Sequence, residues 1–205
     1  IFTHICQVLD SAKIEYLKWD FNRSISDIYS AKLPAKRQGE VAHRYILGLY
    51  DMLEKLIQRY PDILIEGCSG GGGRFDAGML YYTPQIWCSD DTDAIERLSI
   101  QYGTSFGYPV STMGSHVSKC PNEQTGRMTP LNTRATVAMS GTFGYELDVN
   151  QMSDEEKALV KAQIKEFKSY DSLIQNGNYY RLTDPSEAQS YHSWEFVAED
   201  KSEAL

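Results

Sequence analysis

The sequence has no cluster of basic residues and no long apolar run. Its 205 residues include 20 Lys and Arg against 28 Asp and Glu, a formal net charge of −8. Nucleic acids and anionic membrane surfaces are bound through clustered basic side chains, so this balance argues against both as partners. No stretch reaches the roughly 18 apolar residues of a membrane-spanning helix, and no signal peptide is visible. We therefore expect a cytoplasmic globular protein with an acidic surface.

Cysteine is also scarce. The four cysteines form no C-x-x-C pair and no Cys/His spacing of a zinc site, and they stand at Cys6, Cys68, Cys88 and Cys120. Four thiols would permit two disulfides, but the chain is neither small nor rich in cysteine, which favours reduced thiols. The sequence thus predicts neither a metal site nor a disulfide framework.

The glycines of the tract EGCSGGGGRFDAG, residues 66–78, suggest two functional motifs, a serine-hydrolase turn and a phosphate-binding loop, and the tract lacks an essential part of each. Its G-C-S-G-G portion matches the G-x-S-x-G pattern of serine hydrolases, but that pattern needs a helix directly after the serine. Four consecutive glycines do not propagate a helix, which argues against Ser69 as a nucleophile. The phosphate-binding patterns G-x-x-x-x-G-K-[ST] and G-x-G-x-x-G at a helix start are absent. We favour a third interpretation, in which the glycines let a ligand approach the backbone.

Strand-like and helical segments alternate along the chain. Strands are predicted at residues 13–20, 62–68, 84–90, 110–118 and 141–149. Helices are predicted at residues 41–60, 91–103 and 152–169. Pro61 ends the first of these helices, and Ser153 with Glu156 forms a capping box at the start of the last.

This alternation predicts an α/β fold with a parallel sheet. The predicted strands end in polar residues, in the segments KWD, EGCSGG, WCSDD and MGSH. Function gathered at the carboxyl ends of parallel strands is typical of a (β/α)8 barrel or a doubly wound sheet. Five strands cannot close a barrel, so a barrel would be present as its second half. The first residue is Ile, which also indicates a piece of a longer chain, and from about residue 190 we expect the first strand of a further domain.

Carboxylates follow two of the predicted strands. Asp20 lies beside Trp19, and Lys18 points to the same side of the strand as Asp20 because residues two apart share a face. A cation there would hold Asp20 ionised, which suits a carboxylate nucleophile. The structural alternative is an exposed salt bridge at a strand end.

The segment WCSDDTD places Asp90, Asp91 and Asp93 within four residues, next to Trp87. Acids this close repel one another, so at least one should have a raised pKa unless some cap the following helix. Asp91 and Asp93 both suit that capping role. One ionised acid, one proton donor and aromatic rings that stack on a sugar are together typical of a retaining glycosidase.

The segments YLKWDFNR, EGCSGGGGRFDAGMLYYTPQIWCSDDTDAIERLSIQYGTS and MGSHVS closely resemble the catalytic half of the α-galactosidases of glycoside hydrolase family 36. The resemblance extends to about residue 185. It implies the second half of a (β/α)8 TIM barrel, about strands 4–8, over residues 1–188, and the beginning of a C-terminal β-sandwich domain over 189–205. It also implies hydrolysis of terminal α-galactosides of the melibiose and raffinose type, with retention, through a covalent galactosyl-aspartate.

By this resemblance Asp20 is the nucleophile and Asp90 is the acid/base. The residues that match the family's sugar contacts, or that flank the nucleophile, are Lys18, Trp19, Asn22, Cys68 and Gly70. Phe21 stands where many relatives have Met, and the earlier barrel strands, with their paired aspartates, are absent. The resemblance implies an oligosaccharide substrate, no cofactor, and a homo-oligomer, which in many relatives is a tetramer.

Two alternatives stay open beside this assignment. Half a barrel exposes unpaired strand edges, so the chain could instead be a non-catalytic fragment or binding module. The nearest competing enzyme is an α-N-acetylgalactosaminidase, which needs space around the 2-substituent of the sugar. The resemblance makes the loop that holds Cys68 the candidate filter for that substituent.

Overall fold

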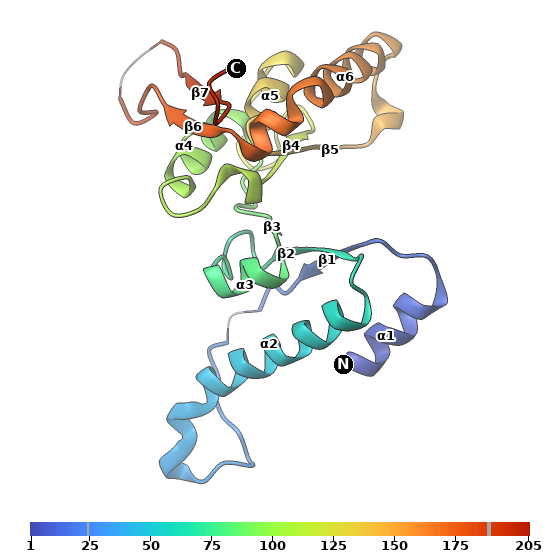
Figure 1. Ribbon diagram of the computed structural model, residues 1–205, viewed down its shortest axis with the longest axis vertical. Coiled ribbons are helices and arrows are strands. Elements are labelled where there is room, and N and C mark those ends of the chain that lie inside the picture. The colour runs from blue at the N-terminus through green and yellow to red at the C-terminus, as the bar shows by residue number, and fades with distance from the viewer. Residues whose placement is uncertain (24, 188–189) are drawn as a thin grey trace. The chain divides into compact units, whose positions relative to one another are not determined.

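The computed structural model describes residues 1–23, 25–187 and 190–205, which divide into two compact units, Ile1–Ile86 and Trp87–Leu205. The first unit contains α1 (Phe2–Ser11), β1 (Tyr16–Asp20), the 3₁₀ helix η1 (Ala35–Glu40), α2 (Val41–Arg59), β2 (Leu64–Cys68), α3 (Ala77–Tyr82) and β3 (Gln85–Ile86). Among the described residues, no helix is long and apolar enough to cross a membrane. Figure 1 shows the elements in chain order.

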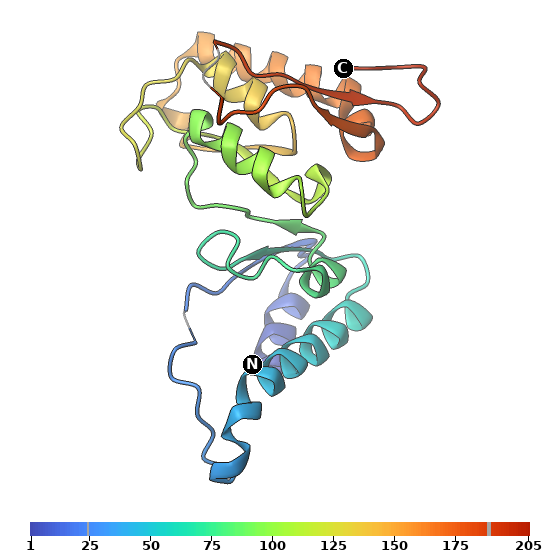
Figure 2. The ribbon, with the colours of Figure 1, turned by 90° about the vertical axis from the view of Figure 1, so that its left-hand side faces the viewer.

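The strands of the first unit form one parallel sheet in the order β1-β2-β3. In its register Lys18 lies opposite Glu66, and Asp20 lies opposite Cys68. Both strands therefore end at the same edge of the sheet, which brings their last residues together. Figures 1 and 2 show α1 and α2 on the same side of this sheet.

The core of the first unit forms where α2 meets α1 and α3. Leu49, Leu53 and Leu56 recur at helical spacing on one face of α2, and all three are buried. They pack with Cys6 and Leu9 of α1 and with Met79 of α3. This packing fixes the helices beneath the strands that carry the predicted nucleophile.

The second unit contains α4 (Ala94–Thr104), the 3₁₀ helices η2 (Val110–Thr112) and η3 (Val149–Gln151), β4 (Gly114–Ser118), α5 (Leu131–Ala138), β5 (Thr142–Glu146), α6 (Asp154–Asn176), β6 (Asn178–Arg181) and β7 (Trp194–Val197). Strands β4 and β5 pair in parallel. The predicted capping box is confirmed, because Ser153 and Glu156 bond reciprocally at the start of α6. An antiparallel pair of β6 and β7 follows α6 (Figure 2).

The predicted strands are present but shorter than expected. The largest difference is at 84–90, where only Gln85 and Ile86 pair with β2. Beyond them the chain turns on itself, since the backbone N–H of Asp91 donates to Ser89 Oγ. Helices α1, α3 and α5 and strand β6 were not predicted.

The predicted domain boundary lies between residues 188 and 189, which are both outside the described residues. Strand β7, which the sequence predicts as the first strand of a further domain, pairs with β6. Its Phe196 is 1% exposed and packs against Leu173 and Ile174 of α6. Residues 190–205 therefore contribute to the core of the second unit.

Candidate active site

Five of the predicted site residues gather at the ends of β1 and β2. Asn22 links them, since its Nδ2 donates to Asp20 Oδ2 at 2.9 Å and its Oδ1 accepts from the Gly70 N–H at 2.6 Å. Cys68 lies opposite Asp20 on the neighbouring strand. Lys18 completes the group two residues before Asp20, on the same face of β1. The Asp20 carboxylate therefore accepts a hydrogen bond from Asn22 and lies beside the last residue of β2.

The Cys68 thiol keeps its proton. Burial raises its pKa to about 11, and the neighbouring Asp20 carboxylate acts in the same direction. A thiol with this pKa is a hydrogen-bond donor at neutral pH and a poor nucleophile. All four cysteines of the chain are free.

The glycine tract forms a tight turn between β2 and α3. Gly70 has a φ of +54°, which favours glycine, and this conformation directs its N–H to Asn22. At Gly73 the close neighbour is the protein itself, because an added Cβ would lie 2.4 Å from the Ser69 carbonyl oxygen. Part of the tract thus serves close packing of the turn and not only approach of a ligand.

The geometry around Ser69 does not support a serine hydrolase. Its Oγ donates to the Phe21 carbonyl oxygen at 2.7 Å, which ties the turn to the end of β1. Helix α3 begins only at Ala77, after Asp76 caps it by accepting from the Met79 N–H. A nucleophile elbow requires a helix directly after the serine.

Among the predicted site residues of the first unit, Trp19 is the one that the structure does not bring into this group. Successive side chains of a strand point to opposite faces, so Trp19 faces away from Lys18 and Asp20. It packs instead against the helical core that includes Leu53. The pattern that places Lys18 beside Asp20 thus also separates both from Trp19.

Sequence analysis missed Glu66, which lies opposite Lys18 on β2. Glu66 is 3% exposed, and the Lys18 Nζ lies 3.7 Å from its Oε1. The spacing on β1 predicts Asp20 as the neighbour of Lys18, and the structure adds this buried carboxylate. Its signal in the sequence is a lone acid within an apolar strand, two residues before Cys68.

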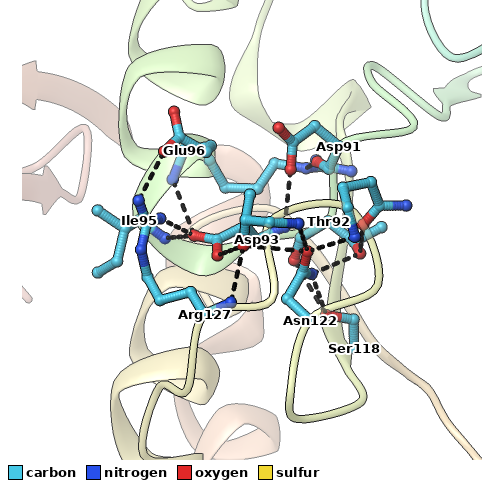
Figure 3. Close-up of polar contacts among 11 residues, drawn as sticks. Asp91, Thr92, Asp93, Ile95, Glu96, Ser118, Asn122 and Arg127 are labelled. Atoms are coloured by element: carbon cyan, nitrogen blue, oxygen red, sulfur yellow. Dashed lines mark hydrogen bonds and ion pairs between the residues drawn. The ribbon is translucent and has the colours of Figure 1, made fainter.

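In the second unit, Asp93 is the N-cap of α4, which confirms the capping alternative (Figure 3). Its Oδ1 accepts from the Ile95 N–H at 2.8 Å and the Glu96 N–H at 3.2 Å. Thr125 Oγ1 donates to Oδ2 at 2.6 Å, and Arg127 forms an ion pair with Oδ1. Burial opposes ionisation of this carboxyl, but these bonds outweigh burial and lower its pKa.

Asp91 is also engaged in local structure, because its Oδ1 accepts from the Asp93 N–H at 3.0 Å. Asp90, in contrast, is exposed. It lines an open pocket of about 550 Å³ together with Trp87, Thr92, Ser118, Lys119, Glu123, Gln124, Glu146, Leu147 and Asp148. Of the three neighbouring acids, Asp90 is the one that lines this pocket.

A buried arginine that sequence analysis also missed holds the backbone on both sides of Asp90. Arg97 of α4 donates to the Ser89 carbonyl oxygen at 2.8 Å and to the Asp91 carbonyl oxygen at 2.6 Å. It also donates to the Gly114 carbonyl oxygen at the start of β4, at 3.1 Å. The acidic segment is thereby fixed to α4 and β4.

Carboxylates and sugar-sized pockets beside the ends of parallel strands are typical of the α/β glycoside hydrolases. The family model described as Melibiase matches residues 1–177. The chain therefore belongs to the Melibiase family.

Curated relatives match this chain over its whole length. It is 60% identical over 205 residues to alpha-galactosidase Mel36A of Lactobacillus acidophilus, and covers 28% of that protein. It is 57% identical to the bifunctional alpha-galactosidase/sucrose kinase AgaSK of Mediterraneibacter gnavus, and covers 21% of it. The chain thus spans between a fifth and a third of the length of these two relatives.

Solved structures agree with this assignment. The family 36 α-galactosidase AgaA of Geobacillus stearothermophilus is 54% identical, with a TM-score of 0.96 over 99% of this chain and 28% of AgaA. Variants of AgaA have been crystallised with raffinose and with stachyose. The chain therefore has the α/β fold of the corresponding part of a family 36 galactosidase.

Proposed function

We propose that the protein is a retaining α-galactosidase in which this chain carries both catalytic carboxylates. The observation that carries the proposal is the group formed by Asp20, Asn22, Cys68 and Gly70 at the ends of two parallel strands. This group lies in a chain that is 60% identical to an α-galactosidase. The parallel pairing of β1-β2-β3 and of β4-β5 supports placing the chain at about strands 4–8 of a (β/α)8 barrel.

The proposed reaction has two steps. Asp20 attacks the anomeric carbon, the glycosidic bond breaks, and Asp90 gives its proton to the departing oxygen. Asp90, now ionised, removes a proton from a water molecule, whose oxygen attacks the anomeric carbon and releases Asp20. Two inversions give net retention.

The proposed substrates are terminal α-galactosides of the melibiose and raffinose type. Structures of AgaA variants with raffinose and stachyose support this choice. Lys18 and Asn22 offer N–H donors for the sugar hydroxyls, and we assign Cys68 to the wall of the sugar pocket. The Gly70 N–H already donates to Asn22, so we assign Gly70 to orienting that amide. Homo-oligomeric assembly and a cytoplasmic location remain predictions from the sequence.

The first prediction tests the nucleophile. In the complete gene product that carries this sequence, Asp20→Ala should lower turnover of p-nitrophenyl α-galactoside by about a thousandfold or more, because no covalent intermediate can form. Azide should restore turnover and yield the β-galactosyl azide, the inverted product.

The matched control is Asp62→Ala, which removes an exposed carboxylate in the turn before β2. It should retain normal turnover. Normal turnover by the Asp20→Ala variant would instead exclude Asp20 as the nucleophile. Comparing p-nitrophenyl α-galactoside with its α-N-acetylgalactosaminide decides between the two sugar specificities.

A further inference from the structure

Glu66 is a buried carboxylate that the proposed reaction does not use. It lies in the middle strand of the β1-β2-β3 sheet and is 3% exposed. Its Oε2 accepts a hydrogen bond from the Tyr16 hydroxyl of β1. Within the described residues its Oε1 accepts no hydrogen bond, and the Lys18 Nζ lies 3.7 Å from that oxygen.

Stability alone gives little reason for a carboxylate at this position. Burying an ionised group is unfavourable unless cations and donors compensate for the lost hydration. Here one carboxylate oxygen has only an ion pair, and the cation of that pair remains 39% exposed at its side chain. A well-packed apolar residue at the site of such a pair is often as stable or more stable.

The register of the sheet shows what Glu66 does for its neighbours. Lys18 pairs with Glu66 across the strands, and Asp20 pairs with Cys68 in the same way. Because residues two apart share a face, the four side chains occupy the corners of one patch. Glu66 and Cys68 are its buried corners, while Lys18 and Asp20 are exposed. Glu66 therefore lies on the buried side of Lys18, and Lys18 lies beside the proposed nucleophile, Asp20.

The distance between the two charges is also informative. At 3.7 Å the contact is an ion pair and not a hydrogen bond. The charge of Glu66 thus restrains the ammonium of Lys18 through charge attraction, without a hydrogen bond between the two groups. The hydrogen bond from Tyr16 holds Glu66 in turn.

We propose that Glu66 is a positioning residue, which holds the Lys18 ammonium beside Asp20 so that Lys18 can donate to a sugar hydroxyl. This inference rests on the proposed α-galactosidase function. It assigns Glu66 no contact with the substrate. Its effect on the reaction passes through Lys18, with Tyr16 as the support of the carboxylate.

The test is Glu66→Gln in the complete gene product, an isosteric change that removes the charge. The sugar contact of Lys18 is made in both ground and transition states, so its weakening should raise KM about tenfold and leave kcat within about twofold. The matched control is Glu15→Gln, which neutralises the exposed partner of Lys13 at 2.9 Å. Its KM should equal that of the wild type.

A double-mutant cycle separates positioning from a merely structural role. Lys18→Met should itself raise KM, and adding Glu66→Gln to it should change kcat/KM by less than about twofold. Tyr16→Phe, which removes only the hydroxyl that supports Glu66, should raise KM about two- to threefold and provides the test if Glu66→Gln does not fold.

Each outcome bears on a distinct claim. The positioning role is overturned if KM is unchanged in both Glu66→Gln and Tyr16→Phe. It is also overturned if Glu66→Gln lowers kcat/KM equally in the wild type and in the Lys18→Met variant. Either result leaves the proposed function intact. A wild-type protein that does not hydrolyse α-galactosides, or a fully active Asp20→Ala variant, overturns both.

Discussion

At the scale of single residues, the proton of Cys68 is held by two effects that act together. Burial disfavours the thiolate, and the Asp20 carboxylate disfavours a second negative charge next to it. The register of β1 and β2 holds the thiol beside Asp20. Cys68 therefore contributes to the nucleophile as a neutral group.

This gives a prediction for thiol reactivity. At pH 8, iodoacetamide should label Cys68 roughly a hundred times more slowly than an unperturbed thiol, because a pKa of about 11 leaves little thiolate. Peptide mass spectrometry over a time course measures the rate. Asp20→Asn should increase it, since the neighbouring charge is lost, although burial remains. Labelling of Cys68 at the rate of a free thiol would contradict the assignment of this pKa.

Much of the residue-scale site could be predicted from the sequence. The motif around Asp20 and the C-S-G-G segment indicate residues that the structure brings together, because register places equivalent strand ends side by side. Glu66 was missed because it is the one charged residue of β2, and the sequence of that strand does not show which cation it pairs with. Residues two apart share a face, so Glu66 lies on the face of Cys68 as Lys18 lies on the face of Asp20. Aligning the ends of the two strands would then have placed Glu66 opposite Lys18.

At the scale of elements, Asp93 joins α4 to the segment that follows β4. Its carboxylate caps the helix, accepts from Thr125 and pairs with Arg127. Arg127 also donates to Glu96 Oε1 at 2.9 Å, which ties the same segment to the first turn of α4 (Figure 3). The start of α4 is therefore stabilised by a loop some thirty residues later in the chain.

The dependence of stability on pH follows from the lowered pKa of Asp93. A carboxyl whose folded pKa lies below its unfolded pKa stabilises the protein fully above the unfolded value, which is about 4. That contribution is lost as the pH falls through the folded pKa. Asp93→Ala should lower the free energy of unfolding by about 2–3 kcal/mol at pH 7, because a cap and the partner of Arg127 are both removed.

The matched variant is Asp93→Asn, which keeps a capping oxygen and removes the charge. It should lose less stability at pH 7 than the alanine variant, and its difference from the wild type should shrink below about pH 4. Denaturant unfolding between pH 7 and pH 2 measures both. A constant difference across this range would show that the charge of Asp93 does not contribute.

Helix α5 was not predicted because a buried charged residue interrupts its apolar pattern. Helix α5 carries Arg134, which is buried and donates to the Thr129 and Ser118 carbonyl oxygens at 2.9 and 2.5 Å. Periodicity treats such a residue as exposed, so the apolar face of this helix is not visible in the sequence. Helices α2, α4 and α6 have clear apolar faces or caps and were predicted for that reason.

At the scale of the whole molecule, an edge strand and exposed apolar side chains occur in the same unit. Within the described residues, β1 pairs on one side only, with β2. Large apolar side chains are exposed in the same unit, among them Ile1, Val8 and Tyr16. An unpaired strand edge beside exposed apolar groups favours association with other chains.

We therefore expect residues 1–205 expressed alone to be insoluble or inactive, in contrast to the complete gene product. Size-exclusion chromatography and the p-nitrophenyl α-galactoside assay, applied to both at equal concentration, measure this. A monomeric and active 205-residue protein would show that the remaining part of the relatives' length is not needed for turnover.

The turn that follows β2 has a consequence for mutational tolerance. Gly70 and Gly73 are both glycines, but substitutions at the two positions would be selected against for different reasons. At Gly70 a side chain meets no atom within 4 Å and only the backbone angle opposes it, so Asn is the least harmful replacement. At Gly73 even alanine collides with the Ser69 carbonyl oxygen, so the turn itself must open. A saturation library of this tract would therefore distinguish Gly70, where the backbone conformation limits substitution, from Gly73, where the lack of space for a side chain limits it.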